Sequence, residues 1–125
     1  MAVRGDVSDL IYHLALDGEW QEAAERGGPY GRSTLGKSVA EVGFMHCSFA
    51  SQVEMIARLI YRDRGDVLLL VVDPSKIAAP IRIENTDGGD ERFPHIYGEL
   101  PIDAVVRVAA VPLRNDGTLE LGGLI

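Results

Sequence analysis

The run Val67–Val72 constrains the fold of this chain more than any other feature, because every one of its residues is apolar. A run that is short and uniformly apolar is typical of a β-strand covered on both faces. The chain has 125 residues, 46% of them hydrophobic and 25% charged, so it can bury such a strand without disulfides or metals. We therefore predict one domain over residues 1–125, with residues 1–8 as a loose N-terminal lead.

Five further segments have the composition of strands. Residues 10–16 are rich in strand formers and end at a turn, and Ile81–Glu84 alternates apolar and charged residues like a half-exposed strand. Residues 44–47 and 104–111 are also predicted to be strands. Asn115-Asp116-Gly117 predicts a hairpin turn that leads to a last strand over residues 118–121.

Two main helices are predicted between these strands. The first covers residues 19–26, and the second begins at Ser48 or Ser51. In the second helix, apolar residues recur at the spacing of a buried stripe, which is formed by Val53, Ile56, Ala57 and Ile60. Ser33 is predicted to cap a short turn or helix toward Glu41. This pattern predicts an α+β domain with a mixed, mostly antiparallel sheet and two main helices.

Composition and charge exclude several function classes. The formal net charge of −7 opposes a sequence-independent grip on the phosphates of nucleic acid or of an anionic membrane. The single cysteine, Cys47, permits no internal disulfide, and no basic segment leads into a long apolar run. We therefore expect a cytoplasmic protein with a small-molecule or nucleotide ligand and without a membrane partner.

The three histidines lie in separate segments that also carry aromatic and small polar residues. His13 lies in the first predicted strand, His46 in Gly43–Ser48 and His95 in Phe93–Gly98. Because imidazole can serve as an acid or a base near neutral pH, this grouping predicts one site assembled from distant pieces. Three imidazoles could also bind zinc, but no two of them lie within one helical turn, so we expect no metal.

The residues that follow His46 belong to the predicted site or to the core. Adjacent strand residues point to opposite faces, so Cys47 faces the core if His46 faces the site, and Ser48 returns to the side of His46. Ser48 either donates a hydrogen bond to a ligand or caps the next helix. Gln52 lies one helical turn further on and is predicted to face the same pocket.

The carboxylates offer two candidates for the site. Glu84 alternates with Arg82 on one face of a predicted strand, which is also the pattern of a solvated surface pair. Glu99 follows the His95 motif and is the second candidate. The acidic residues between Asn85 and Arg92 are interpreted as solvated loop residues.

Several motifs taken together carry a resemblance to a known family: Tyr12-His13, Gly43–Ser48 followed by Gln52, Leu69–Pro74, Arg82-x-Glu84 and Phe93–Pro101. In this order they resemble the bacterial family known as domain of unknown function 952, over roughly Leu10–Leu113. That family is grouped by fold likeness with the ADP-ribosyltransferase superfamily, which includes RNA 2′-phosphotransferases. The resemblance implies a split pair of small sheets flanking a cleft for NAD or an ADP-ribose-like ligand.

The resemblance also implies roles for individual residues. His13 matches the histidine that holds the nicotinamide-side ribose, and Ser48 matches a middle polar position. His46 and His95 would contact phosphate or transfer protons. Glu84 substitutes for the usual catalytic glutamate, which no residue of the last strands matches. The implied catalytic residues are thus His46, His95 and Glu84, and the implied ligand-binding residues are His13, Ser48, Gln52, Arg82 and Tyr97.

Two other interpretations stay open at the level of sequence. In the first, the same cleft is a non-catalytic module that senses a nucleotide or another small anion, which the missing glutamate favours. In the second, the histidines and Tyr97 form a buried polar network that only stabilises the loop before Pro101.

Overall fold

The computed structural model describes residues 9–86 and 88–125. Within these residues the protein is α+β, with antiparallel sheets and three α-helices. The predicted loose lead over residues 1–8 lies outside the described residues. No helix of the described chain is long and apolar enough to cross a membrane.

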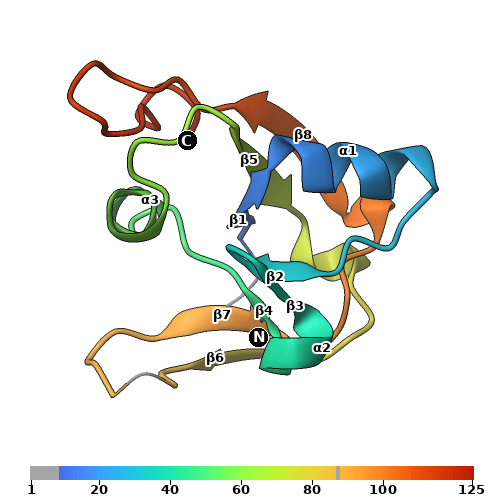
Figure 1. Cartoon of the computed structure of the whole chain (residues 1–125). Helices are drawn as coiled ribbons and strands as arrows, with labels where there is room; N and C mark the ends of the chain where they lie inside the picture. Colours follow the sequence, from blue (N-terminus) through green and yellow to red (C-terminus); the bar gives the residue numbers. More distant parts are fainter. Residues whose placement is uncertain (1–8, 87) are drawn as a thin grey trace.

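The first sheet is built around the apolar run over residues 67–72. It contains β1 (Ile11–Leu16), β5 (Val67–Val72) and β8 (Val105–Ala110) in the order β1-β5-β8, and both pairings are antiparallel. All residues of β5 are buried, so the prediction of a strand covered on both faces is confirmed. Since β5 takes the centre, one edge of β1 remains open to the rest of the molecule (Figure 1).

The second sheet lies below the first in Figure 1. It contains β4 (Met45–His46), β7 (Phe93–Ile96) and β6 (Ile81–Glu84) in the order β4-β7-β6, again with antiparallel pairings only. A separate hairpin joins β2 (Arg32–Thr34) and β3 (Lys37–Ser38). The prediction of a mixed sheet is therefore wrong for the described strands, all of which pair antiparallel.

Several strands differ from the sequence prediction, and one difference is the β2–β3 hairpin, which lies where a loop and a short turn or helix were expected. β7 was not predicted, because Pro94 lacks the N–H that a central strand needs. The Pro94 carbonyl nevertheless accepts from the Cys47 N–H at 3.1 Å, which keeps the ladder joined. The predicted last strand over residues 118–121 is reduced to a single bridge between Leu113 and Leu119.

The helical segments are α1 (Asp17–Glu25), α2 (Val39–Val42) and α3 (Val53–Ile60), with 3₁₀ turns η2 (Pro74–Lys76) and η3 (Ile102–Ala104). Both predicted main helices are present as α1 and α3. The N-cap residue of α3 is Gln52, so neither Ser48 nor Ser51 caps this helix. The short helix α2 is capped by Ser38 in a reciprocal box with Glu41, so the predicted cap at Ser33 is wrong.

Two hydrophobic clusters cover the two faces of the first sheet. On one face Ile11, Leu70 and Val72 pack against α1 and against buried residues of the second sheet. On the other face Leu69 and Val71 pack against α3 and the C-terminal segment, with Val53, Ala57, Leu119 and Leu121. Because the second sheet and α3 cover opposite faces of β1, the open edge of β1 lies between them.

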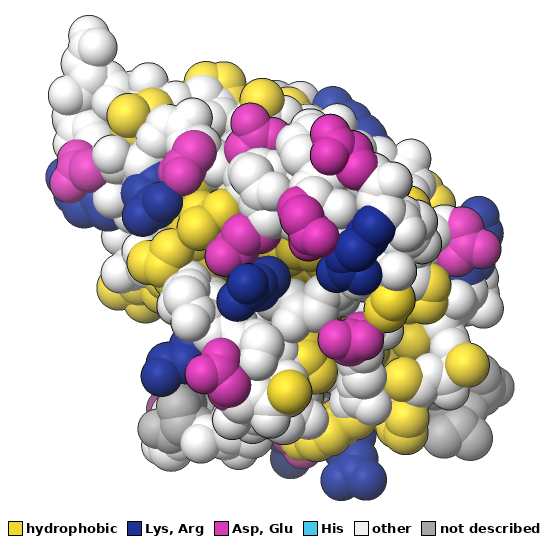
Figure 2. All heavy atoms as spheres, turned by 45° about the vertical axis from the view of Figure 1, so that its right-hand side comes forward, with side chains coloured by type: hydrophobic (Ala, Val, Ile, Leu, Met, Phe, Trp, Pro, Cys, Tyr) yellow, Lys and Arg dark blue, Asp and Glu magenta, His cyan; other side chains and the backbone are white. Residues whose placement is uncertain are grey.

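The surface on one side of the molecule carries charges of both signs. Figure 2 shows acidic and basic side chains interspersed with hydrophobic ones, and no histidine is visible on this face. The net charge of −7 therefore does not produce a continuous acidic patch on this face.

Candidate functional site

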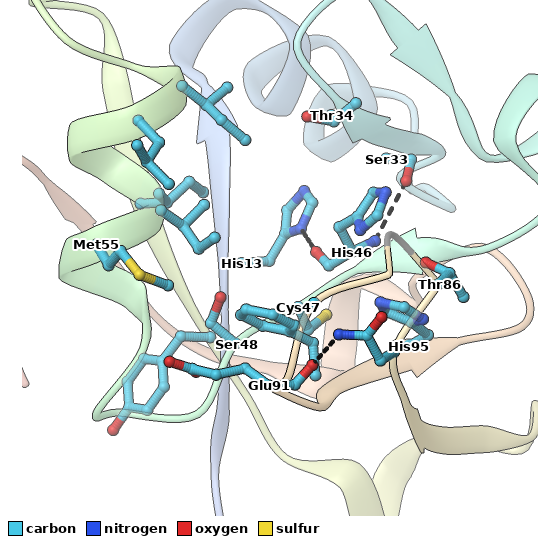
Figure 3. A pocket seen from close by; sticks show the side chains of 18 of the residues that line it. His13, Ser33, Thr34, His46, Cys47, Ser48, Met55, Thr86, Glu91 and His95 are labelled. Carbon is cyan, nitrogen blue, oxygen red and sulfur yellow. Dashed lines mark hydrogen bonds between the residues drawn. The ribbon is translucent and has the colours of Figure 1, made fainter.

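A pocket of about 500 Å³ opens along the edge of β1 that faces away from β5. Its walls come from α3 on one side and from β2, β4 and β7 on the other, with the loop after β6 at the rim (Figure 3). The polar lining includes all three histidines, Ser33, Thr34, Ser48, Asn85 and Thr86, and the apolar lining includes Met55, Ile56, Leu59, Ile60 and Phe93. The structure thus brings His13, His46, His95 and Ser48 to one hollow.

Backbone groups on this edge of β1 bond to neighbouring segments of the chain. The Tyr12 N–H and carbonyl both bond the backbone of Ser48 at 2.8 Å, on the side away from β5. Because backbone groups alternate along an antiparallel strand, the N–H and carbonyl of Leu14 face the same way. The Leu14 carbonyl accepts from the Tyr61 hydroxyl at 3.4 Å, and Leu14 itself lines the pocket.

His13 is a neutral imidazole whose second nitrogen is buried without a partner among the described residues. Its Nδ1 donates to the backbone carbonyl of His46 at 2.6 Å, and only 2% of the residue is exposed. Burial lowers the pKa of His13 to about 4, which outweighs the opposite effect of the nearby carbonyls. With the proton on Nδ1, Nε2 carries a lone pair, and no group of the described residues pairs with it.

His46 and His95 lie side by side on the neighbouring strands β4 and β7. They are directly paired in the β4–β7 register, and their rings meet edge to face with centroids 5.1 Å apart. Phe44 stacks on His95 with centroids 4.1 Å apart and an interplanar angle of 18°. His95 is 2% exposed and His46 is exposed, so the first ring is held by packing while the second reaches solvent.

A carboxylate and a phenol stand behind His95. The Nδ1 of His95 lies 3.0 Å from Oε2 of Glu84, and the Tyr97 hydroxyl donates to the same oxygen. The bond from Tyr97 lowers the pKa of Glu84, and the same bond raises the pKa of the Tyr97 phenol. The guanidinium carbon of Arg82 lies 4.8 Å from the centre of the Tyr97 ring.

The roles predicted for Glu84, Arg82 and Tyr97 change with this geometry. None of the three lines the pocket, because each lies beyond His95 on the same face of the second sheet. Glu84 fixes the His95 ring with the Nδ1 proton directed at the carboxylate, which leaves Nε2 for the pocket. A ligand confined to the pocket would therefore be affected by these residues only through His95.

Gln52 also takes a different position from the one predicted. Its Nε2 donates to Oε1 of Glu91 at 3.0 Å and to the Arg92 carbonyl at 2.8 Å, and its Oε1 accepts from the Phe49 N–H at 2.9 Å. Gln52 does not line the pocket. It instead anchors the loop that carries Glu91 to the rim.

Sequence reasoning missed several residues of the site, among them Ser33 and Glu91. Ser33 donates to the Phe44 carbonyl at 2.6 Å and accepts from the His46 N–H at 3.2 Å, so it ties β2 to β4. Glu91 lines the rim although it was interpreted as a solvated loop residue. No local sequence pattern indicates the role of either residue, because their hydrogen-bond partners lie 11 to 39 residues away along the chain.

Cys47 also lines the pocket, but as a buried thiol. Cys47 is 3% exposed, and burial raises the pKa of its thiol, so it is a poor nucleophile. In residues 9–86 and 88–125, no group of three or more His, Cys, Asp or Glu is arranged to hold a metal ion.

The fold and the pocket define an α+β protein with a histidine-lined hollow between two small antiparallel sheets. The chain belongs to the family described as "Protein of unknown function (DUF952)", which matches residues 15–108. The family resemblance predicted from the sequence motifs is thus confirmed. No curated protein matches the chain.

Solved structures similar to this chain come from Caulobacter crescentus. The crystal structure of its protein CC0527 is 30% identical, with 91% of this chain and 96% of that chain covered and a TM-score of 0.79. A crystal structure of a double mutant of CC0527 is also 30% identical over the same shares, with a TM-score of 0.78. The solution structure of CC0527 is 31% identical over 93% of this chain and 96% of that chain, with a TM-score of 0.75.

Proposed function

We propose that the pocket binds NAD or a related ADP-ribose-type ligand, in a fold of the ADP-ribosyltransferase type. The observation that carries the proposal is the convergence of His13, His46, His95 and Ser48 on one hollow of about 500 Å³. Small-molecule sites in proteins have volumes of about 300–1,000 Å³ and combine an apolar lining with a few convergent polar groups.

The lining supports contacts to a base and its ribose. Nε2 of His13 is covered in this structure, and movement of the residues that cover it would let it accept from a ribose hydroxyl, which would satisfy a buried polar atom. The outward N–H of Leu14 suits the carbonyl of a carboxamide. Met55, Leu59 and Phe93 offer apolar surface to the face of a heterocycle.

Bound NAD would supply a ribose carbon that transfers to a nucleophile when its bond to nicotinamide breaks. His95 would take the proton of that nucleophile at Nε2, because Glu84 accepts a hydrogen bond from the Nδ1–H group and stabilises the imidazolium. Tyr97 holds Glu84 in this orientation. Glu84 is therefore a positioning residue in the proposal, and His46, next to His95, is the second proton-transfer group.

Binding without turnover is the second candidate function. The observation in its favour is that Glu84 lies behind His95 rather than in the lining. The carboxylates that do line the pocket, Asp90 and Glu91, are exposed loop residues. A transferase needs a carboxylate or an equivalent charge close to the reacting carbon.

Titration of the chain with NAD, ADP-ribose and a 2′-phosphorylated oligonucleotide, followed by product analysis, tests the proposal. We expect saturable binding of NAD. If turnover occurs, His95→Gln should reduce nicotinamide release by about 100-fold or more. Glu84→Gln should lower the rate less and shift its pH profile, which a purely structural role would not do. Binding without release of nicotinamide supports the second candidate, and absence of binding refutes both.

A further inference from the structure

The charge of the pocket lining is one-sided. None of the residues that line it in the described chain is Lys or Arg, whereas Asp90 and Glu91 contribute carboxylates at the rim. His13 adds no positive charge, because burial lowers its pKa to about 4. A phosphate bound here would meet no permanent cation, although Arg and Lys are the side chains that protein phosphate sites use most.

Glu91 is anchored, which distinguishes it from an ordinary solvated loop residue. Gln52 is 8% exposed and donates to the Glu91 carboxylate at 3.0 Å. The same amide donates to the Arg92 carbonyl at 2.8 Å, so the loop backbone next to Glu91 is fixed as well. A buried side chain thus places one negative charge at the mouth of the pocket.

The second observation concerns His13, on the inner wall. Its Nε2 is buried, lacks a partner among the described residues and carries a lone pair. A lone pair accepts a hydrogen bond from a hydroxyl, but it repels the oxygens of a phosphate or carboxylate. A ligand hydroxyl that displaced the residues covering Nε2 would therefore be accepted there, whereas a phosphate would not, in agreement with the acidic rim.

The wall formed by α3 completes this chemistry. Ile56 and Met55 line the pocket, as do Leu59 and Ile60, which are 70% and 42% exposed. Such an apolar surface packs against the face of a flat ring whatever the charge of the ring. The acidic rim on the other side of the pocket then determines which charge the ring can carry. The combination of an apolar wall, a hydroxyl acceptor and an acidic rim suits a neutral or cationic heterocycle joined to a sugar.

Building on the proposed function, we propose that the pocket selects its ligand by charge: it takes the uncharged or cationic base and ribose of an N-riboside and leaves every phosphate outside. The pyridinium ring of nicotinamide riboside is positively charged, so this half of NAD fits the lining. A 2′-phosphate does not fit, because it would place two negative charges against Glu91 and the His13 lone pair.

Calorimetric titration of the whole chain with three matched probes tests this selection. The probes are nicotinamide riboside, which is a cation, its 5′-mononucleotide, which adds a phosphate, and benzamide riboside, which is uncharged. Measurements at pH 8 are appropriate because an ordinary imidazole is neutral there. We expect nicotinamide riboside to bind at least as tightly as the mononucleotide.

A charge-removing variant sharpens the test. Glu91→Gln should weaken the binding of nicotinamide riboside about fivefold, as expected for the loss of an ion pair at a partly exposed rim. The binding of benzamide riboside should weaken less than about twofold, because this ligand carries no charge. The variant keeps an oxygen to accept from Gln52, so the loop stays anchored. Glu25→Gln, at the exposed end of α1, removes the same charge elsewhere and should change neither affinity.

Three results would overturn the inference, and they differ from those that overturn the proposed function. The mononucleotide or NAD could bind about tenfold more tightly than the riboside, or Glu91→Gln could weaken both ribosides equally. NAD could also bind while the riboside does not. Each of these refutes the charge selection but leaves the nucleotide pocket in place, whereas failure of every probe and of NAD to bind refutes both.

Discussion

His13 makes the stability of the protein depend on pH in a way that one substitution should remove. The residue is 2% exposed, and burial lowers its pKa to about 4, whereas an imidazole in the unfolded chain titrates near 6.5. Between these two values the unfolded state binds more protons than the folded state. The free energy of unfolding therefore falls as the pH drops from 6.5 toward 4 and is fully retained at pH 7.

The size of this effect follows from the two pKa values. A difference of about 2.5 pKa units corresponds to about 3 kcal/mol, most of which is lost by pH 4. His13→Asn keeps a donor near the position of Nδ1 for the His46 carbonyl but has no group that titrates in this range. The variant should therefore lose about 3 kcal/mol less stability than the wild type between pH 7 and pH 4.

Urea unfolding at pH 7, 6, 5 and 4, with both proteins at the same ionic strength, measures this difference. All other titrating groups are shared, so their contributions cancel in the comparison. Equal pH dependence of the wild type and His13→Asn, within about 0.5 kcal/mol, would show that His13 is not held neutral by burial.

Three further outcomes follow from the same contacts. Ser33→Ala should cost about 2–4 kcal/mol in urea unfolding, because it leaves the Phe44 carbonyl and the His46 N–H without their partner; a loss below about 1 kcal/mol contradicts this role. Leu69→Ala in the central strand should cost about 2–5 kcal/mol, whereas a truncation at the 70% exposed Leu59 should cost under about 0.5 kcal/mol, and similar losses would refute the assigned core. Cys47 should resist a thiol reagent at pH 8 until urea unfolds the protein, and rapid labelling of the native state would show that it is accessible.

The local pattern of the sequence predicted most elements of the fold. β5 and β6 could be predicted from the apolar run over residues 67–72 and from the alternation over residues 81–84. A strand buried on both faces has apolar residues throughout, and a strand buried on one face has them at every second position. β7 could not be predicted, because Pro94 breaks the local rule and the strand is stabilised by neighbours on both sides. The N-cap residues of α2 and α3 were also predicted incorrectly, because several serines lie close to the start of each helix and the sequence does not show which of them is the cap.

The candidate site was predicted in part for the same reason. Histidines on strands could be grouped from sequence, but their partners depend on strand register. Glu84 is diagonal to His95 across β6 and β7, so its position behind the imidazole follows only from the pairing. Gln52 and Glu91 are 39 residues apart, and no local signal links them.

A crystal structure of the chain with NAD bound tests the central claim most directly. We expect the ligand between α3 and β7, with a ribose hydroxyl about 3 Å from Nε2 of His13 and the base against the wall of α3. A ligand bound elsewhere, or an imidazole of His13 that stays unpaired while NAD occupies the pocket, would contradict it.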